Sequence, residues 1–164
     1  MLHIAPELCF MDRFESLPHL DYITADIESP LAKVKMDIHA IPFEANTFDV
    51  IFCNHVLEHV ANDMLAMREM HRVLKPGGWA ILQIPFFHPI PEHTFEDATI
   101  TDPKEREKVF GQNDHLRLYG HDYPDRLKLA GFNVMEDRLV FELSEEEVKR
   151  FALPEREVIY RVVK

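Results

Sequence analysis

Short apolar runs alternate with amphipathic stretches along most of the chain. Each run is rich in Val, Ile, Phe or Ala, which is typical of strands buried on both faces of a parallel sheet. Strands are predicted over residues 2–5, 21–26, 34–38, 48–54 and 79–85, with a short helix over 9–17. Strand and helix units joined by short connections predict a doubly wound α/β sheet, in which ligands bind beyond the carboxyl ends of the strands.

A second helix is predicted after the fourth strand. Asn62 or Asp63 can cap it, because both side chains accept hydrogen bonds from free backbone N–H groups. Apolar residues at helical spacing predict its buried face: Val60, Met64, Met67, Met70 and Leu74. The sequence KPGG, residues 75–78, is predicted to end this helix before the fifth strand begins.

The second half of the chain is less regular. Residues 86–102 are rich in Pro, His and acidic residues without periodicity, which predicts a long active-site loop. A short helix is predicted over 102–110 and another over 121–132, the latter with Asp122 as its cap, Pro124 in its first turn and Gly131 as its end. Two late strands are predicted over 132–143 and 157–164.

Length and charge narrow the range of functions. The chain of 164 residues is 46% hydrophobic, enough for one compact domain over 1–164 and too little for two. Its net charge of −11 opposes binding to nucleic acids or anionic membranes. No apolar run approaches a membrane span and no signal-peptide pattern is found, so we expect a cytoplasmic protein. Two cysteines, Cys9 and Cys53, predict reduced thiols rather than a disulfide framework.

Polar residues follow the predicted strands at the positions where a ligand would bind. Asp26 closes the second strand 19 residues after Glu7, a spacing at which an acid can accept both hydroxyls of a ribose. Asp37, with apolar Ile38 beside it, suits an adenine ring and its amine, and Asn54 ends the fourth strand. Each acid alone is also an ordinary turn or cap residue, but together these strand ends predict a nucleoside site.

The sequence MDIHAIPFEANTFDVIFCNHVLEHVANDMLAMREMHRVLKPGGWAILQIP, residues 36–85, closely resembles the central block of class I S-adenosylmethionine-dependent methyltransferases. The resemblance extends more loosely through YITADIE and LKLAGFNV. It implies a Rossmann-like, mostly parallel seven-stranded sheet that binds S-adenosylmethionine. It also implies that Asp26 holds the ribose, Asp37 and Ile38 the adenine, and Asn54 and His55 the methionine end. The cofactor-binding residues predicted in this way are Ala5, Pro6, Glu7, Asp26, Ile27, Asp37, Ile38, Asn54 and His55.

The first turn departs from the glycine-rich pattern of that family. Ala5, Pro6 and Glu7 stand there, so a pyrophosphate would meet a carboxylate and no glycine backbone. A sulfonium and an ammonium group would instead be attracted to Glu7, although Glu7 can equally well serve the positive end of the following helix. Because Met1 lies almost inside the first strand, we expect the helices that cover the cofactor in this family to be missing and the chain to be truncated.

Histidines near the strand ends are the candidates for acid–base chemistry. His55, His59 and His115 are predicted as catalytic residues, and His88, His115 and Arg117 as contacts of the acceptor. A surface or capping role is the competing interpretation for each histidine. The run HPIPEH, residues 88–93, fits no regular ligand spacing, so no metal site is predicted.

These features together predict transfer of a methyl group to an oxygen or nitrogen of a small-molecule acceptor, by in-line displacement. Two alternatives from other classes remain: a non-catalytic binding or scaffold protein that keeps the methyltransferase fold, and a nucleotide-dependent oxidoreductase. The glycine-free first turn disfavours the oxidoreductase. The acceptor and the oligomeric state are not determined by the sequence.

Overall fold

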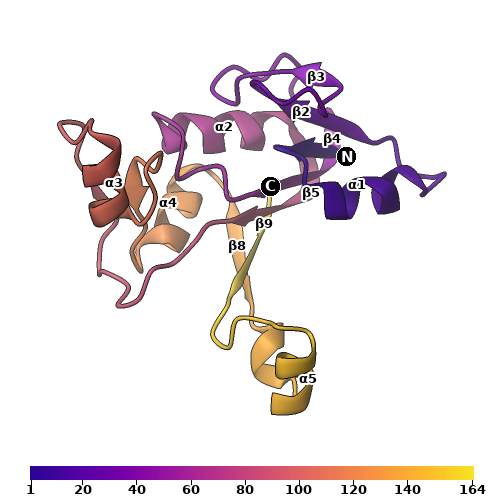
Figure 1. The fold of residues 1–164 in the computed structure, drawn as a ribbon. Helices are drawn as coiled ribbons and strands as arrows, with labels where there is room; N and C mark the ends of the chain where they lie inside the picture. Colours follow the sequence, from indigo (N-terminus) through magenta and orange to yellow (C-terminus); the bar gives the residue numbers. More distant parts are fainter.

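A seven-stranded sheet forms the centre of the molecule, and the computed structural model describes all residues, 1–164 (Figure 1). Its strand order is β3-β2-β1-β4-β5-β9-β8, and β9 runs antiparallel to both of its neighbours. The strands are β1 (Leu2–Ile4), β2 (Ile23–Asp26), β3 (Val34–Lys35), β4 (Phe48–Asn54), β5 (Leu74–Gln83), β8 (Asn133–Asp137) and β9 (Ile159–Val163). The predicted mostly parallel, doubly wound sheet is confirmed. The order reverses between β1 and β4, so a ligand crevice is expected at the carboxyl ends of these strands.

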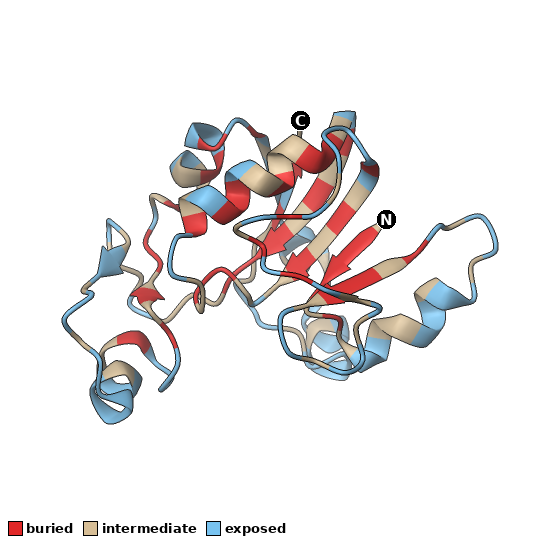
Figure 2. Ribbon diagram, turned by 90° about the horizontal axis from the view of Figure 1, so that it is seen from above, coloured by how far each residue is buried: buried red, intermediate tan, exposed pale blue.

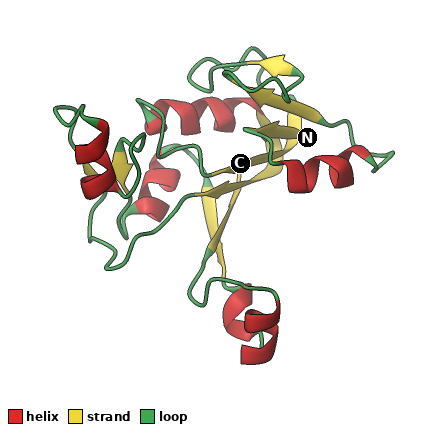
Figure 3. Cartoon of the chain, in the orientation of Figure 1, coloured by secondary structure: helices red, strands yellow, loops and turns green.

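The helices and a small second sheet surround this centre (Figure 3). The helices are α1 (Leu8–Glu15), α2 (Asp63–Val73), α3 (Pro103–Phe110), α4 (Tyr123–Leu129) and α5 (Glu145–Arg150), with a 3-10 turn over Leu139–Glu142. The second sheet pairs β6 (Phe95–Glu96) with β7 (Arg117–Leu118). None of the helices has the length and apolar character that crossing a membrane requires.

Helices α1 and α2 lie on opposite faces of the sheet. Phe10 and Phe14 of α1 pack edge-on against Phe52 of β4. The neighbouring residues Ile51 and Cys53 point the other way, into the main hydrophobic core with α2. Figure 2 shows this asymmetry, because buried residues follow the central strands and α2 while α1 has none.

The start of α2 agrees with its predicted cap, and its end does not agree with the predicted stop. The Asn62 side chain accepts a hydrogen bond of 2.9 Å from the Leu65 N–H. The helix ends at Val73, and KPGG already belongs to β5. Gly78 is needed for close packing rather than as a stop signal, since a Cβ there would lie 2.9 Å from the Lys75 carbonyl oxygen.

Three predicted strands differ clearly in their bounds from the structure, and one helix was not predicted. The third strand keeps only Val34–Lys35, the fifth spans Leu74–Gln83 instead of 79–85, and the strand predicted over 132–143 ends at Asp137. The chain then forms the 3-10 turn and α5, which begins with a capping box between Ser144 and Glu147. This small lobe lies at the far end of the β8–β9 hairpin, away from the other helices (Figure 1).

Candidate active site

The carboxyl ends of β1, β2 and β4 meet at one edge of the sheet. Ile4 is in register with both Ala25 and Cys53. The residues that follow on the three strands are Ala5, Asp26 and Asn54. The fold therefore brings together side chains from three distant parts of the sequence, at the position where the strand order reverses.

Two of these strands end in a turn through a residue with positive φ. The φ angle is 49° at Ala5 and 51° at His55, a region that side chains other than glycine rarely adopt. Main-chain hydrogen bonds of 2.9 Å hold both turns, from the Ala5 N–H to the Ala25 oxygen and from the His55 N–H to the Gln83 oxygen. The chain thus bends at once, and the residues that follow stay beside the strand ends.

Glu7 is fixed by hydrogen bonds at the first turn. Its Oε2 lies 2.5 Å from His3 Nε2, and its Oε1 accepts a bond of 2.9 Å from Asn54 Nδ2. Although Glu7 occupies the N-cap position of α1, its side chain makes no bond to the helix. Asn54 Oδ1, on the other side of the same amide, is buried without a partner. A fixed carboxylate and a free acceptor therefore lie next to each other.

His3 is a buried support for this carboxylate. Its Nδ1 lies 2.6 Å from the Tyr22 hydroxyl, and burial raises the pKa of Tyr22 to about 12, which keeps the hydroxyl protonated. Burial also lowers the pKa of His3, against the opposing effect of its bond to Glu7. A neutral His3 that accepts from Tyr22 and donates to Glu7 satisfies all three groups.

Asp26 and Asp37 are both engaged in local turns. Asp26 Oδ1 accepts bonds of 2.7 Å from the backbone N–H groups of Glu28 and Ser29, while its second oxygen has no partner. Asp37 Oδ1 binds the backbone and ring nitrogens of His39, and the backbone bond lowers the pKa of Asp37 most.

The two apolar cofactor residues predicted beside these acids differ in exposure. Ile27 is exposed, whereas Ile38 is part of the hydrophobic core. Little of the Ile38 side chain is therefore available to an adenine ring.

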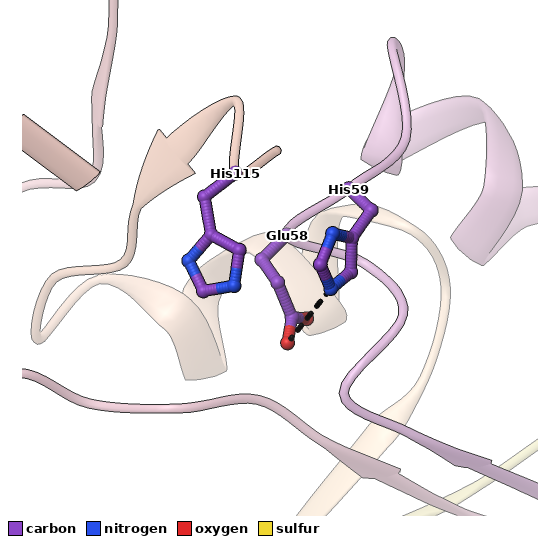
Figure 4. A group of neighbouring side chains, drawn as sticks. All are labelled: Glu58, His59 and His115. Atoms are coloured by element: carbon purple, nitrogen blue, oxygen red, sulfur yellow. Dashed lines mark ion pairs between the residues drawn. The ribbon is translucent and has the colours of Figure 1, made fainter. Parts of the chain in front are cut away.

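The three predicted catalytic histidines surround a buried carboxylate that the sequence analysis did not single out. This is Glu58, which lies between His59 and His115 (Figure 4). His55 Nδ1 lies 3.6 Å from Glu58 Oε1, and this neighbour raises the pKa of His55. The spacing in HVLEHV was the available signal, because it places Glu58 between two histidines in one loop.

The predicted acceptor contacts separate into two environments. His88 lines an open pocket of about 870 Å³, together with Gln83, Phe86, His121 and residues of the β8–β9 hairpin. His115 and Arg117 do not line it. Arg117 is 2% exposed and donates hydrogen bonds to the main-chain oxygens of Leu57 and Ala61. Contact between Arg117 and an acceptor would require these bonds to break.

A buried ion-pair network joins the residues after β5 to the start of α2. Arg126 binds both carboxylate oxygens of Asp63, at 2.6 and 2.8 Å, and Tyr119 donates a bond of 2.9 Å to the same group. Glu96 pairs with Arg126 at 2.8 Å and with Arg117 at 3.2 Å. The network fixes the small sheet and the loop that carries His115 against the main fold.

Known methyltransferases resemble this chain in sequence and in fold. Residues 11–82 match the family described as "Methyltransferase domain". The crystal structure of an S-adenosylmethionine-dependent methyltransferase from Mesorhizobium loti superposes with a TM-score of 0.67 over 99% of this chain and 89% of that chain. Over residues 11–82 the chain resembles the class I S-adenosylmethionine-dependent methyltransferases. At 12% identity, the likeness to the Mesorhizobium protein shows the fold alone.

Two curated proteins that are similar to this chain carry names from quinone biosynthesis. A demethylmenaquinone methyltransferase of Staphylococcus haemolyticus is 31% identical over 114 residues, which are 62% of this chain and 48% of the relative. The ubiquinone/menaquinone biosynthesis C-methyltransferase UbiE of Klebsiella pneumoniae is 44% identical over 111 residues, 63% of this chain and 43% of the relative. The chain thus spans about half the length of the curated relatives it matches.

Proposed function

We propose that the chain binds S-adenosylmethionine at the ends of β1, β2 and β4 and transfers its methyl group to a small-molecule acceptor. The observation that carries the proposal is the pair of polar groups at the first turn. Glu7 offers a fixed negative charge, and Asn54 Oδ1 offers a buried acceptor without a partner. A ligand with an ammonium group and a sulfonium would supply the charge and the donors that these groups lack.

The next strand end suits the ribose of the same ligand. Asp26 Oδ2 has no partner, so this oxygen is available to accept hydrogen bonds from vicinal hydroxyls. The other oxygen already holds the turn through Glu28 and Ser29, which fixes the direction of the carboxylate. Asp26 is therefore presented in one orientation before the ligand binds.

S-adenosylmethionine, when bound, supplies a methyl group on an already activated carbon. Much of the rate can then come from orientation and from exclusion of water, which are properties of the chain. The pocket of about 870 Å³ beside His88 is the site we propose for the acceptor. Gln83 lines this pocket, and its main-chain oxygen accepts a hydrogen bond from the His55 N–H. The pocket therefore adjoins the end of β4.

The proposed acceptor atom is an oxygen or nitrogen that loses a proton on methylation, and His55 is the candidate base. His55 is about half exposed, next to the pocket edge at Gln83. A carbon acceptor on a quinol ring is the second candidate, because the Klebsiella relative is named a C-methyltransferase. Incubation with methyl-labelled S-adenosylmethionine and a panel of phenols, amines and quinols would distinguish them by the bond that carries the label.

A thermal-shift comparison of S-adenosylhomocysteine with NADH tests the cofactor assignment. We expect S-adenosylhomocysteine to raise the melting temperature in a saturable way and NADH to leave it unchanged, because a phosphate would meet Glu7. Stabilisation by NADH alone, or by neither compound, would contradict the proposal.

A further inference from the structure

The carboxylate of Glu58 is buried without adequate partners. Glu58 is 1% exposed, and its Oε2 has no hydrogen-bond partner. Its Oε1 lies 3.6 Å from His55 Nδ1 and 3.8 Å from His59 Nε2, and both distances are longer than a normal hydrogen bond. A buried carboxylate in this condition lacks a positive group that would compensate its charge.

Two histidines beside Glu58, His59 and His115, each have Nδ1 within hydrogen-bonding distance of an oxygen. His115 Nδ1 lies 3.1 Å from the Phe110 carbonyl oxygen, which requires the proton on Nδ1. His59 Nδ1 lies 3.2 Å from an oxygen of Asp114, which favours the same tautomer. In both rings this leaves the lone pair on Nε2, and His115 Nε2 is buried with no partner.

We propose that Glu58, His59 and His115 bind one divalent transition-metal ion of the zinc class. One ligand atom from each residue lies within 4.8 Å of the other two, and Figure 4 shows Glu58 between the two rings. Atoms that each lie about 2.1 Å from a common ion are at most about 4.2 Å apart, so only a small inward shift is needed. The sequence-based expectation of no metal considered residues 88–93 and did not consider this cluster.

The chemistry of the three ligands favours zinc over magnesium or calcium. Two imidazole nitrogens and one carboxylate form a donor set common at zinc and non-haem iron sites, whereas magnesium and calcium prefer oxygen alone. The Phe110 carbonyl and the Asp114 carboxylate supply the outer hydrogen bonds that metal-binding histidines commonly make.

The ion would also join two parts of the fold. Glu58 and His59 belong to the loop after β4, and His115 belongs to the segment between α3 and β7. Only a few polar contacts link these segments near the cluster, among them the bond of 2.8 Å from the Leu116 N–H to the main-chain oxygen of Glu58. Metal binding should therefore raise the melting temperature of the whole chain.

Cobalt(II) and zinc(II) titrations of the metal-stripped full chain test the proposal directly. We expect one Co²⁺ per chain with visible absorption bands of a low-coordinate nitrogen and oxygen site, displaced by one equivalent of Zn²⁺. Glu58→Gln and His59→Asn should each weaken Zn²⁺ binding by at least 10-fold. His93→Asn, an exposed histidine of the long loop outside the cluster, is the matched control and should bind like the parent.

The outcomes separate this site from the cofactor site and from misfolding. His59 is one-third exposed, so His59→Asn should fold even if the buried Glu58→Gln does not, and circular dichroism without metal checks both. Binding that is absent in the parent, or unchanged in His59→Asn, would overturn the proposal. Loss of binding in His93→Asn would also overturn it, by placing the ion on the long loop. The titrations contain no S-adenosylmethionine, so they stand whether or not the proposed methyl transfer is correct.

Discussion

Two carboxylates that flank the end of β4 have opposite hydrogen-bonding environments. Glu7 has a close partner on each oxygen, His3 at 2.5 Å and Asn54 at 2.9 Å, and it remains one-third exposed. Glu58 is nearly inaccessible, has no close partner, and is surrounded by imidazoles whose free nitrogens face it. A glutamate beside histidines can therefore have all of its hydrogen-bond partners within the protein, or it can lack them and suit a bound ion. The distances to its partners distinguish the two cases.

The difference has a functional meaning within one edge of the sheet. A partly exposed carboxylate whose oxygens are already hydrogen-bonded can attract a cationic organic ligand and keep its own partners. A buried carboxylate with the lone pairs of two imidazoles nearby suits a tightly bound metal ion. If this edge carries the two proposed sites, binding of their ligands should respond to different substitutions.

The largest expected effect is at Asp26. Asp26→Ala would remove the proposed charged hydrogen bonds to the ribose, each worth about 1.5 to 3 kcal/mol, and should weaken binding of S-adenosylhomocysteine by roughly 10-fold or more in isothermal titration. Asp26→Asn keeps an oxygen that can hold the turn, so its affinity for S-adenosylhomocysteine should fall less than that of Asp26→Ala. Zn²⁺ affinity should not change in either variant. Equal affinity for S-adenosylhomocysteine in Asp26→Ala and the parent would remove Asp26 from the site.

The two glutamates should respond in opposite directions when their charge is removed. In metal-free protein at pH 8.5, Glu58→Gln should raise the free energy of unfolding by about 1 to 2 kcal/mol, since it removes a buried charge without partners. Glu7→Gln should lower it by about 1 kcal/mol, because charge-assisted bonds are lost. Urea unfolding measures both. A loss of stability in Glu58→Gln without metal would show that its charge is already compensated.

A smaller effect concerns the ligand preference of the first turn. Glu7→Gln keeps the shape of the side chain and removes an attraction to the sulfonium and ammonium of about 1 kcal/mol at this partly exposed position. Binding of S-adenosylmethionine should weaken by several-fold, and binding of adenosine much less. If both ligands bind Glu7→Gln as well as the parent, the charge of Glu7 has no role in recognition.

The smallest effect is a dependence of stability on pH through His3. Burial lowers the pKa of His3 below its ordinary value of 6.5, so the unfolded chain takes up a proton more readily than the folded one. The contribution of neutral His3 to the free energy of unfolding is fully present above pH 6.5 and is lost progressively as the pH falls below this value. His3→Asn should therefore show a shallower decline of unfolding free energy between pH 7.5 and 5.5. His71, whose pKa burial also lowers, supplies the part of the decline that should remain.

The sequence predicted the regular half of this molecule well. Apolar runs such as FDVIFCN have few alternatives to a buried strand, and parallel strands bring their carboxyl ends together, so Glu7, Asp26 and Asn54 could be grouped without coordinates. The strand over 132–143 was predicted too long because Leu139 and Phe141 continue the apolar pattern, although both are exposed in the lobe that contains α5.

The parts of the candidate sites that sequence reasoning missed depend on contacts between segments far apart in sequence. His115 meets Glu58 across 57 positions, and no local pattern encodes that approach. Arg117 was predicted to contact the acceptor, yet it is held by main-chain oxygens and by Glu96. Such roles are set by the long loop after β5, whose path local propensity does not determine.

X-ray diffraction from crystals grown with S-adenosylhomocysteine and Zn²⁺, recorded at the zinc absorption edge, tests most directly whether the edge carries two separate sites. We expect one anomalous peak about 2 Å from the ligand atoms of Glu58, His59 and His115. We also expect S-adenosylhomocysteine with its ribose on Asp26 and its ammonium beside Glu7 and Asn54. A map with no zinc at the cluster, or with the nucleoside bound away from Asp26, would contradict it.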